Sequence, residues 1–249
     1  MPASRQPTHP DHSTARTSSR DDRKEALIVA AVKTLKEVGL SGCTVRALVD
    51  QTPFSKSVVH YYFDSIDEIV ESAYGRLTES YVANIRRAAA QADDPVDAFW
   101  TVVFEWLGPF VTHMSMLRLW LEYCQAGVDS AEKITRAEKI TRAEKKGLRH
   151  SIEAIETLLA DALQEIRPQE IRPQEIRTLA SGASESALRY LMGSVIQIPA
   201  FADSLSVSTV ERVSADLSLL TGVPAPSARW QPFNHDRFCA VCGDDSFSR

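Results

Sequence analysis

The sequence has no long hydrophobic run, few cysteines and no excess of positive charge. No stretch approaches the roughly 18 consecutive apolar residues that a membrane-spanning helix needs, and Met1 to Arg20 lacks the apolar segment of an export signal. Cys43, Cys124, Cys239 and Cys242 are too scattered for a disulfide framework. These absences predict a protein of the reducing cytoplasm that has no membrane partner.

Motifs of the common enzyme classes are also absent. We find no Gly-rich phosphate loop, no nucleophile elbow, no HExxH pair and no paired metal-binding carboxylates on a shared face. His113 and His150 are isolated, which is typical of surface or core histidines. We therefore expect no enzyme activity and no cofactor. An all-helical small-molecule binding protein and an unrecognised cytosolic enzyme stay open as alternatives to the function inferred below.

Charge is divided unevenly along the chain. The net charge is −5 over 249 residues, yet residues 1–63 hold nine Lys and Arg against six Asp and Glu, and the remaining chain holds 19 against 27. A small basic module carried by an acidic body fits a protein that brings only one part close to phosphates.

Residues 44–63, TVRALVDQTPFSKSVVHYYF, predict two short helices around a tight break. Thr44 has the position of an N-cap for the first helix, Gln51–Pro53 ends that helix, and Ser55 caps the second. The polar side chains of the second helix lie in its first two turns, the part that enters a major groove in helix-turn-helix proteins. They are Lys56, Ser57, His60 and Tyr61. An ordinary helical hairpin is the alternative.

A longer helix should precede this pair, from about Asp21 or Asp22 to Val38. Its apolar residues recur at three- and four-residue steps, and Gly39 follows the last of them, as a C-cap does. Its basic residues could contact backbone phosphates or simply be solvated: Arg20, Arg23, Lys24, Lys33 and Lys36.

Residues 22–69 resemble the N-terminal DNA-binding domain of the TetR family of transcriptional regulators. The motif aligns without a gap at Thr44-Val45-Arg46, Ser55-Lys56 and Tyr62-Phe63, and continues at Ser65, Glu68 and Ile69. Two positions depart from it. Pro53 replaces the usual turn glycine, so the turn must avoid a positive φ there. Ile66 replaces a lysine near a phosphate, which should weaken the salt dependence of binding.

The resemblance implies double-stranded DNA as a partner and assigns roles by position. Thr44 and Tyr62 would hold phosphates, while the second helix would offer phosphate or base-edge contacts. The implied interface comprises Thr44, Arg46, Ser55, Lys56, Ser57, Val58, His60, Tyr61 and Tyr62. It further implies a homodimeric repressor that a small-molecule effector releases from a palindromic operator.

The predicted fold is all-α, with an N-terminal three-helix bundle followed by a larger helical effector-binding and dimerisation domain. We expect a disordered segment at 1–20, the helix-turn-helix domain at 21–66, the larger domain at 67–222 and an extended tail at 223–249. The first helix of the larger domain should run from about Ser65 to Gln91, and Asp94-Pro95 should begin the next.

Aromatic residues crowd the stretch from Val96 to Cys124, too many for a single helix stripe. They predict a pocket for an apolar or cationic effector, because aromatic faces can hold either. The candidate lining residues are Phe99, Trp100, Phe104, Trp106, Phe110, Met114, Trp120 and Tyr123, with plain core packing as the alternative for each. Gly108-Pro109 should break the helix there. Leu117–Tyr123, LRLWLEY, also resembles the C-terminal domain of the BetI-like subgroup and points to quaternary amines as effectors to test.

Two tandem repeats follow, AEKITR from Ala131 and QEIRP from Gln164. They are too short for solenoid units, and successive isoleucines of a six-residue period lie about 120° apart on a helix. Local duplication and an error in the sequence record both stay open as their origin. We expect 131–145 to begin a helix that reaches Glu165, and 166–173 to form a bend.

Two more helices are predicted, from Gln174 to Ile198 and from Ser206 to Leu220, with Pro199 ending the first. Small residues in the first would allow close helix approach, and the family builds its four-helix dimer interface from such a pair. The candidate interface residues are Leu188, Leu191, Met192, Val195 and Leu217, with burial inside one chain as the alternative.

The last residues should form a loosely attached tail. His235, Cys239 and Cys242 are three possible zinc ligands, but a second Cys/His pair is missing. We therefore expect no metal site.

Overall fold

The computed structural model describes residues 12–112, 114–132, 137–166, 173–201 and 207–226. Across these ranges the backbone forms helices and no strand, which confirms the all-α prediction. None of the helices described there is long and apolar enough to cross a membrane. The elements are α1 (His12–Gly42), α2 (Val45–Asp50), α3 (Lys56–Tyr62), α4 (Ile66–Ala89), α5 (Pro95–Thr112), α6 (Met114–Glu132), α7 (Ala137–Ile166), α8 (Pro173–Phe201) and α9 (Val207–Thr221).

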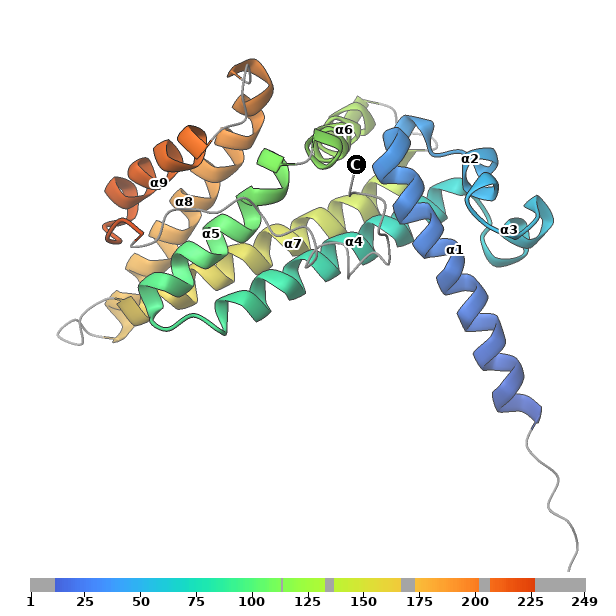
Figure 1. Ribbon diagram of the computed structural model, residues 1–249, viewed down its shortest axis with the longest axis horizontal. Helices are drawn as coiled ribbons and strands as arrows, with labels where there is room; N and C mark the ends of the chain where they lie inside the picture. Colours follow the sequence, from blue (N-terminus) through green and yellow to red (C-terminus); the bar gives the residue numbers. More distant parts are fainter. Residues whose placement is uncertain (1–11, 113, 133–136, 167–172, 202–206, 227–249) are drawn as a thin grey trace, which may run out of the picture.

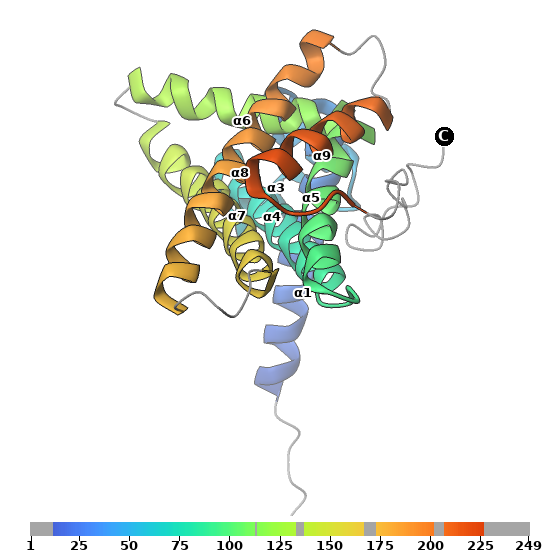
Figure 2. The same ribbon diagram turned by 90° about the vertical axis from the view of Figure 1, so that its left-hand side faces the viewer.

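The molecule is elongated, with α1–α3 at one end and α8–α9 at the other (Figure 1). Helices α4, α5 and α7 run side by side between the two ends, and α6 lies across them against α1 (Figures 1 and 2). One apolar core fills the space beneath α1–α3, and a second fills the body. Tyr81 packs against both cores, so α4 joins the two parts through side-chain contacts as well as through the chain.

Helix α1 is longer than the sequence predicted. It begins at His12, so the segment predicted to be disordered, 1–20, is helical from residue 12 onward; residues 1–11 lie outside the described residues. The helical path is interrupted at Gly39, which has φ 75° and ψ −175°. A side chain disfavours this backbone conformation, so glycine is needed where we predicted the helix to stop.

The starts of helices α2 to α5 were predicted correctly. Thr44 is the N-cap of α2, and its hydroxyl accepts a hydrogen bond from the Ala47 N–H at 3.2 Å. Ser55 is the N-cap of α3 without a side-chain hydrogen bond, and Ser65 caps α4 by accepting from the Glu68 N–H at 3.2 Å. Asp94 does the same for α5, accepting from the Asp97 N–H at 2.8 Å.

Neither proline breaks its helix where we predicted. Pro109 lies inside α5, which continues to Thr112, and α8 passes Pro199 and ends at Phe201. Proline removes one N–H donor and therefore leaves one carbonyl, four residues earlier, without its helical partner. At Pro109 that carbonyl belongs to Glu105, and it lies 3.2 Å from the Tyr81 hydroxyl, which donates to the Trp106 carbonyl as well. A tertiary contact thus replaces the missing bond, and the helix persists.

The prediction that a helix starts at residue 131 is also wrong. Helix α6 continues to Glu132, and α7 begins at Ala137 and ends at Ile166. Residues 133–136 and 167–172, which carry parts of both repeats, lie outside the described residues.

The chain after α9 is attached to the body at its start. Gly222 follows α9 with φ 75°, Val223 is 1% exposed, and the Trp100 indole N–H donates to the Pro224 carbonyl at 2.8 Å. The predicted loose tail is therefore anchored at 223–224. Residues 227–249, including His235, Cys239 and Cys242, lie outside the described part of the chain.

Candidate nucleic-acid interface and ligand cavity

The α2–α3 pair is held by its turn and by the core below it. The Thr52 hydroxyl donates to the Val49 carbonyl at 3.4 Å and accepts from the Phe54 N–H at 3.3 Å. Pro53 is exposed beside it, and within the described residues positive φ occurs only at glycines, Gly39 and Gly222. The turn therefore accommodates proline without a positive φ, as predicted.

Helix α3 has one buried side and one exposed side. Val59 and Phe63 are 1% and 2% exposed and pack with Leu48 of α2 in the core of this part. Because residues 59 and 63 are one turn apart, the intervening positions turn outward. Tyr61 is 66% exposed, an unusual position for a large aromatic side chain.

Most of the predicted DNA-binding residues are exposed. Seven are exposed, namely Thr44, Arg46, Ser55, Lys56, Ser57, His60 and Tyr61. Val58 and Tyr62 are half-buried, and the Tyr62 ring meets the Tyr61 ring edge-on at 5.0 Å between centroids. The structure thus leaves seven of the nine predicted side chains accessible to solvent.

Burial makes Cys43 a structural residue of this part. It is 6% exposed in the core beneath α2 and α3, and burial raises the pKa of its thiol to about 11. A thiol that stays protonated at neutral pH is a poor nucleophile.

A cavity of about 50 Å³ lies in the body, at the junction of α4, α5, α6, α7 and α8. Its walls carry five aromatic rings and no acidic or basic side chain. The lining residues are Tyr74, Leu77, Thr78, Tyr81, Trp106, Phe110, Met116, Leu119, Trp120, Ser151, Ile152, Ile155 and Met192.

The predicted pocket residues divide between this cavity and the core. Trp106, Phe110 and Trp120 line the cavity. Tyr123 lies behind its wall and stacks on Tyr74, with 3.3 Å between ring centroids. For the other aromatic candidates the alternative of core packing holds: Phe99 and Trp100 are buried in the body core, and Phe104 packs on them. The side chain of Met114 lies outside the described residues.

The walls that other helices supply were not predicted from the sequence. Tyr74, Leu77, Thr78 and Tyr81 are spaced along one face of α4 at steps of three and four, so a helical periodicity was present there. The contributions of α7 and α8 gave no comparable signal, because only the packing of five helices brings them to the same space.

The comparisons with known proteins identify the first of these two sites. Residues 27–73 match the family model described as "Bacterial regulatory proteins, tetR family". The match contains α2, the turn, α3 and the first turns of α4, and it excludes the start of α1. Residues 27–73 therefore carry a DNA-binding domain of the TetR family.

The relatives that this chain matches are named as transcriptional regulators and not as enzymes. The "HTH-type transcriptional regulator BetI" of Stenotrophomonas maltophilia is 26% identical over 44% of this chain and 57% of its own length. The "HTH-type nicotine-responsive transcriptional repressor HdnoR" of Paenarthrobacter nicotinovorans is 27% identical over 32% of this chain and 44% of its own. BetI of Burkholderia mallei is 31% identical over 30% and 40%. The chain thus spans about half the length of the relatives it matches. No solved structure matches it.

Helix α6 connects the TetR-family DNA-binding domain to the cavity. Met116 and Leu119 line the cavity and also belong to the core beneath α1–α3. Two other side chains of α6, Arg118 and Glu122, form hydrogen bonds with the end of α1. The Leu40 N–H donates to Glu122 Oε2 at 2.5 Å, and Arg118 Nη2 donates to the Glu37 carbonyl at 3.0 Å. We call these two bonds the α1–α6 clasp.

The residues that we predicted for a dimer interface are mostly buried within one chain. Leu188, Leu191, Val195 and Leu217 are at most 4% exposed in the body core, and Met192 is half-buried at the cavity. The alternative of burial inside one chain therefore holds for these four. The exposed apolar side chains of α8 and α9 are instead Ile196, Leu219 and Leu220.

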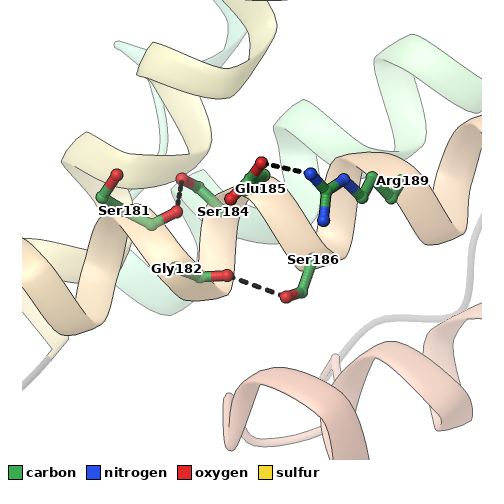
Figure 3. A network of polar contacts seen from close by, with 6 residues as sticks. All are labelled: Ser181, Gly182, Ser184, Glu185, Ser186 and Arg189. Atoms are coloured by element: carbon green, nitrogen blue, oxygen red, sulfur yellow. Dashed lines mark hydrogen bonds and ion pairs between the residues drawn. The ribbon is translucent and has the colours of Figure 1, made fainter.

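Between Ser181 and Arg189, polar groups of α8 bond to one another within the helix (Figure 3). Ser184 and Ser186 donate to the carbonyls of Ser181 and Gly182 at 2.9 and 2.8 Å, and Glu185 pairs with Arg189. Ser184 is fully buried, so its bond belongs to the packing within this chain.

Proposed function

We propose that the protein is a dimeric transcriptional repressor that a small-molecule effector releases from a palindromic operator. The observation that carries the proposal is the exposed, partly aromatic side of α3 on a domain whose family is known. Such a regulator would act in the cytoplasm, where the DNA lies.

The DNA contact would use α3 in a major groove and the start of α2 against the backbone. Lys56 and Ser57 lie in the first turn of α3, His60 and Tyr61 one turn later, and all four side chains are exposed. Phosphate contacts by such residues position a domain, whereas contacts to base edges discriminate sequences. His60 and Tyr61 are therefore the residues that we expect to set base preference.

The test is binding of the purified full chain to duplexes from the region upstream of its own gene. We expect retardation of at least one fragment, with affinity falling steeply as salt rises, because released counterions drive such binding. Failure to bind any fragment at low salt would refute the proposal. His60→Ala should change which base substitutions in that fragment are tolerated. Lys56→Gln should lower the binding affinity for all fragments by a similar factor.

Dimerisation follows from the small number of bases that one helix-turn-helix reads, since two copies spaced along DNA can read a palindrome. We place the second copy against α8 and α9, where Leu219 is 86% exposed and Ile196 is 58% exposed. Leu219→Glu should shift the sedimentation coefficient from that of a dimer to that of a monomer without lowering the unfolding temperature. A dimer that survives this change and Ile196→Glu would place the interface elsewhere.

The effector would occupy the cavity. Its five aromatic side chains favour an apolar or aromatic molecule, and the absence of an acidic side chain from the lining favours an uncharged ligand over a cation. The walls would have to move apart to admit it, because about 50 Å³ is smaller than the roughly 150 Å³ cavity that holds benzene. A relative named as nicotine-responsive supports an aromatic base among the compounds to test. A thermal-shift screen should include neutral aromatic compounds and quaternary amines as separate sets, and stabilisation by the second set alone would contradict the preference for an uncharged ligand.

Coupling would pass through α6. A ligand displaces an equilibrium only when it binds one state more tightly than the other. Met116 and Leu119 contact both the cavity and the core beneath the DNA-binding domain, so a ligand that moves them also moves the α1–α6 clasp. The expected result is a different separation of the two DNA-binding domains in the dimer.

A cavity-filling substitution separates this coupling from DNA binding itself. Ile152→Trp adds bulk to the α7 wall of the cavity, so it should abolish the effect of an effector on operator affinity while leaving affinity without effector intact. Thr157→Trp introduces the same side chain at an exposed position of α7 that does not line the cavity, and it should keep the response. An unchanged response in Ile152→Trp would exclude this cavity as the effector site.

A further inference from the structure

The first part of α1 lies outside the family match and extends from the molecule. The match begins at residue 27, whereas the helix begins at His12. Figure 1 shows this part of α1 standing clear of the other helices, on the side where α2 and α3 lie. A helical segment of about four turns is therefore present beside the DNA-binding surface and outside the part that matches the family.

Two basic side chains of this segment lie over aromatic rings of the α3 region. The Arg20 guanidinium carbon is 5.5 Å from the centroid of the Tyr61 ring, and Lys24 Nζ is 5.1 Å from that of Phe63. Cations within about 6 Å of a ring face are attracted by it. Positions 20 and 24 are one turn apart, so both point from the same side of α1.

Charge is sorted around α1 at this point. At about 100° per residue, Lys24 lies about 40° from Arg20 on one side and Arg23 about 60° on the other. Asp21 lies about 100° from Arg20, beyond Lys24, and Asp22 about 160° away. All five residues are exposed. In the ion pairs found among the described residues, neither Arg20 nor Lys24 takes part. The side of α1 that leans on α3 is therefore basic and accessible to an anion.

We propose that this segment of α1 is a second DNA-contacting element, in which Arg20 and Lys24 bind backbone phosphates beside the groove that α3 enters. The inference rests on the proposed DNA binding of α3. Tyr61 holds the Arg20 guanidinium at the edge of the α3 surface, so the charge is positioned before DNA arrives and binding costs less side-chain entropy. These two cations would compensate for the uncharged Ile66, which stands where the family often has a lysine near a phosphate.

The test measures the salt dependence of binding by the full chain. Each phosphate contact contributes about 0.9 to the slope of log K against log salt, so Arg20→Gln with Lys24→Gln should reduce that slope by about 1.8. The advantage of the unsubstituted protein over this double variant should shrink about tenfold between 50 and 200 mM salt. Glutamine keeps the long stems and the helix propensity of both positions.

The matched control is Arg86→Gln with Arg87→Gln, which removes the same charge from exposed positions in the last turn of α4, far from α3 (Figure 1). Its slope should equal that of the unsubstituted protein. Equal slopes for both double variants would overturn the inference while leaving DNA binding by α3 intact. Failure of the unsubstituted protein to bind DNA is a different outcome and would refute the proposed function instead. Circular dichroism of each variant verifies that the helices are retained.

Discussion

Gly39→Ala tests the α1–α6 clasp directly. The glycine has φ 75° and ψ −175°, a conformation that costs other residues about 1–3 kcal/mol. A Cβ at this position would also lie 2.6 Å from Glu122 Oε2, the atom that accepts the Leu40 N–H. Moving that carboxylate forfeits a hydrogen bond to a charged group, about 1.5–3 kcal/mol. The two effects together predict a loss of roughly 2.5–6 kcal/mol in the free energy of unfolding.

Urea denaturation followed by far-UV circular dichroism measures this loss. Gly182→Ala is the matched control, because an added Cβ there meets nothing within 4 Å and the residue lies in a regular helix. That substitution should stabilise the protein by up to about 1 kcal/mol. A Gly39→Ala protein within about 1 kcal/mol of the unsubstituted one would refute the strain and contact argument.

A double-mutant cycle then separates the strain from the contact. Glu122→Ala alone should cost about 1.5–3 kcal/mol, but in the Gly39→Ala background it should cost much less, because the hydrogen bond is already broken. Additive costs would show that Gly39 and Glu122 act independently. The same variants, measured for operator affinity with and without effector, would show whether the clasp carries the coupling.

Three further outcomes are expected. Tyr81→Phe should lower the free energy of unfolding by about 1–3 kcal/mol, because the carbonyls of Glu105 and Trp106 lose the hydroxyl that they share; an unchanged stability would mean that water replaces the hydroxyl. Burial and the hydrogen bond to Asp216 raise the pKa of Tyr190 from 10.0 to about 12, so the fold favours the protonated phenol. Stability should therefore fall as pH rises from about 10 to about 12, and Tyr190→Phe should remove this part of the fall in urea midpoints. Thr44→Ala should cost about 1 kcal/mol by removing the α2 cap, while Thr44→Ser should restore it.

Helix starts and the DNA-binding motif could be predicted because they depend on neighbours in the chain. Thr44, Ser65 and Asp94 each cap a helix by accepting from an N–H three residues later, an interaction complete within one turn. Gly39 likewise stands where the apolar repeat of α1 stops. The extension of α1 to His12 was missed, because its polar composition is typical of disorder and only the helix itself shows otherwise.

The sequence by itself determined the helical class, the capped α2–α3 pair and the crowding of aromatic residues, since each follows from local hydrogen bonds or composition. Only the tertiary structure decided which aromatic rings line the cavity and which fill the core. It also decided that Leu188 and Leu217 are buried within one chain, and that Pro109 stays inside a helix because Tyr81 supplies the missing donor. Burial and the pairing of buried polar atoms depend on residues far apart in the chain, and no local pattern records where those residues meet.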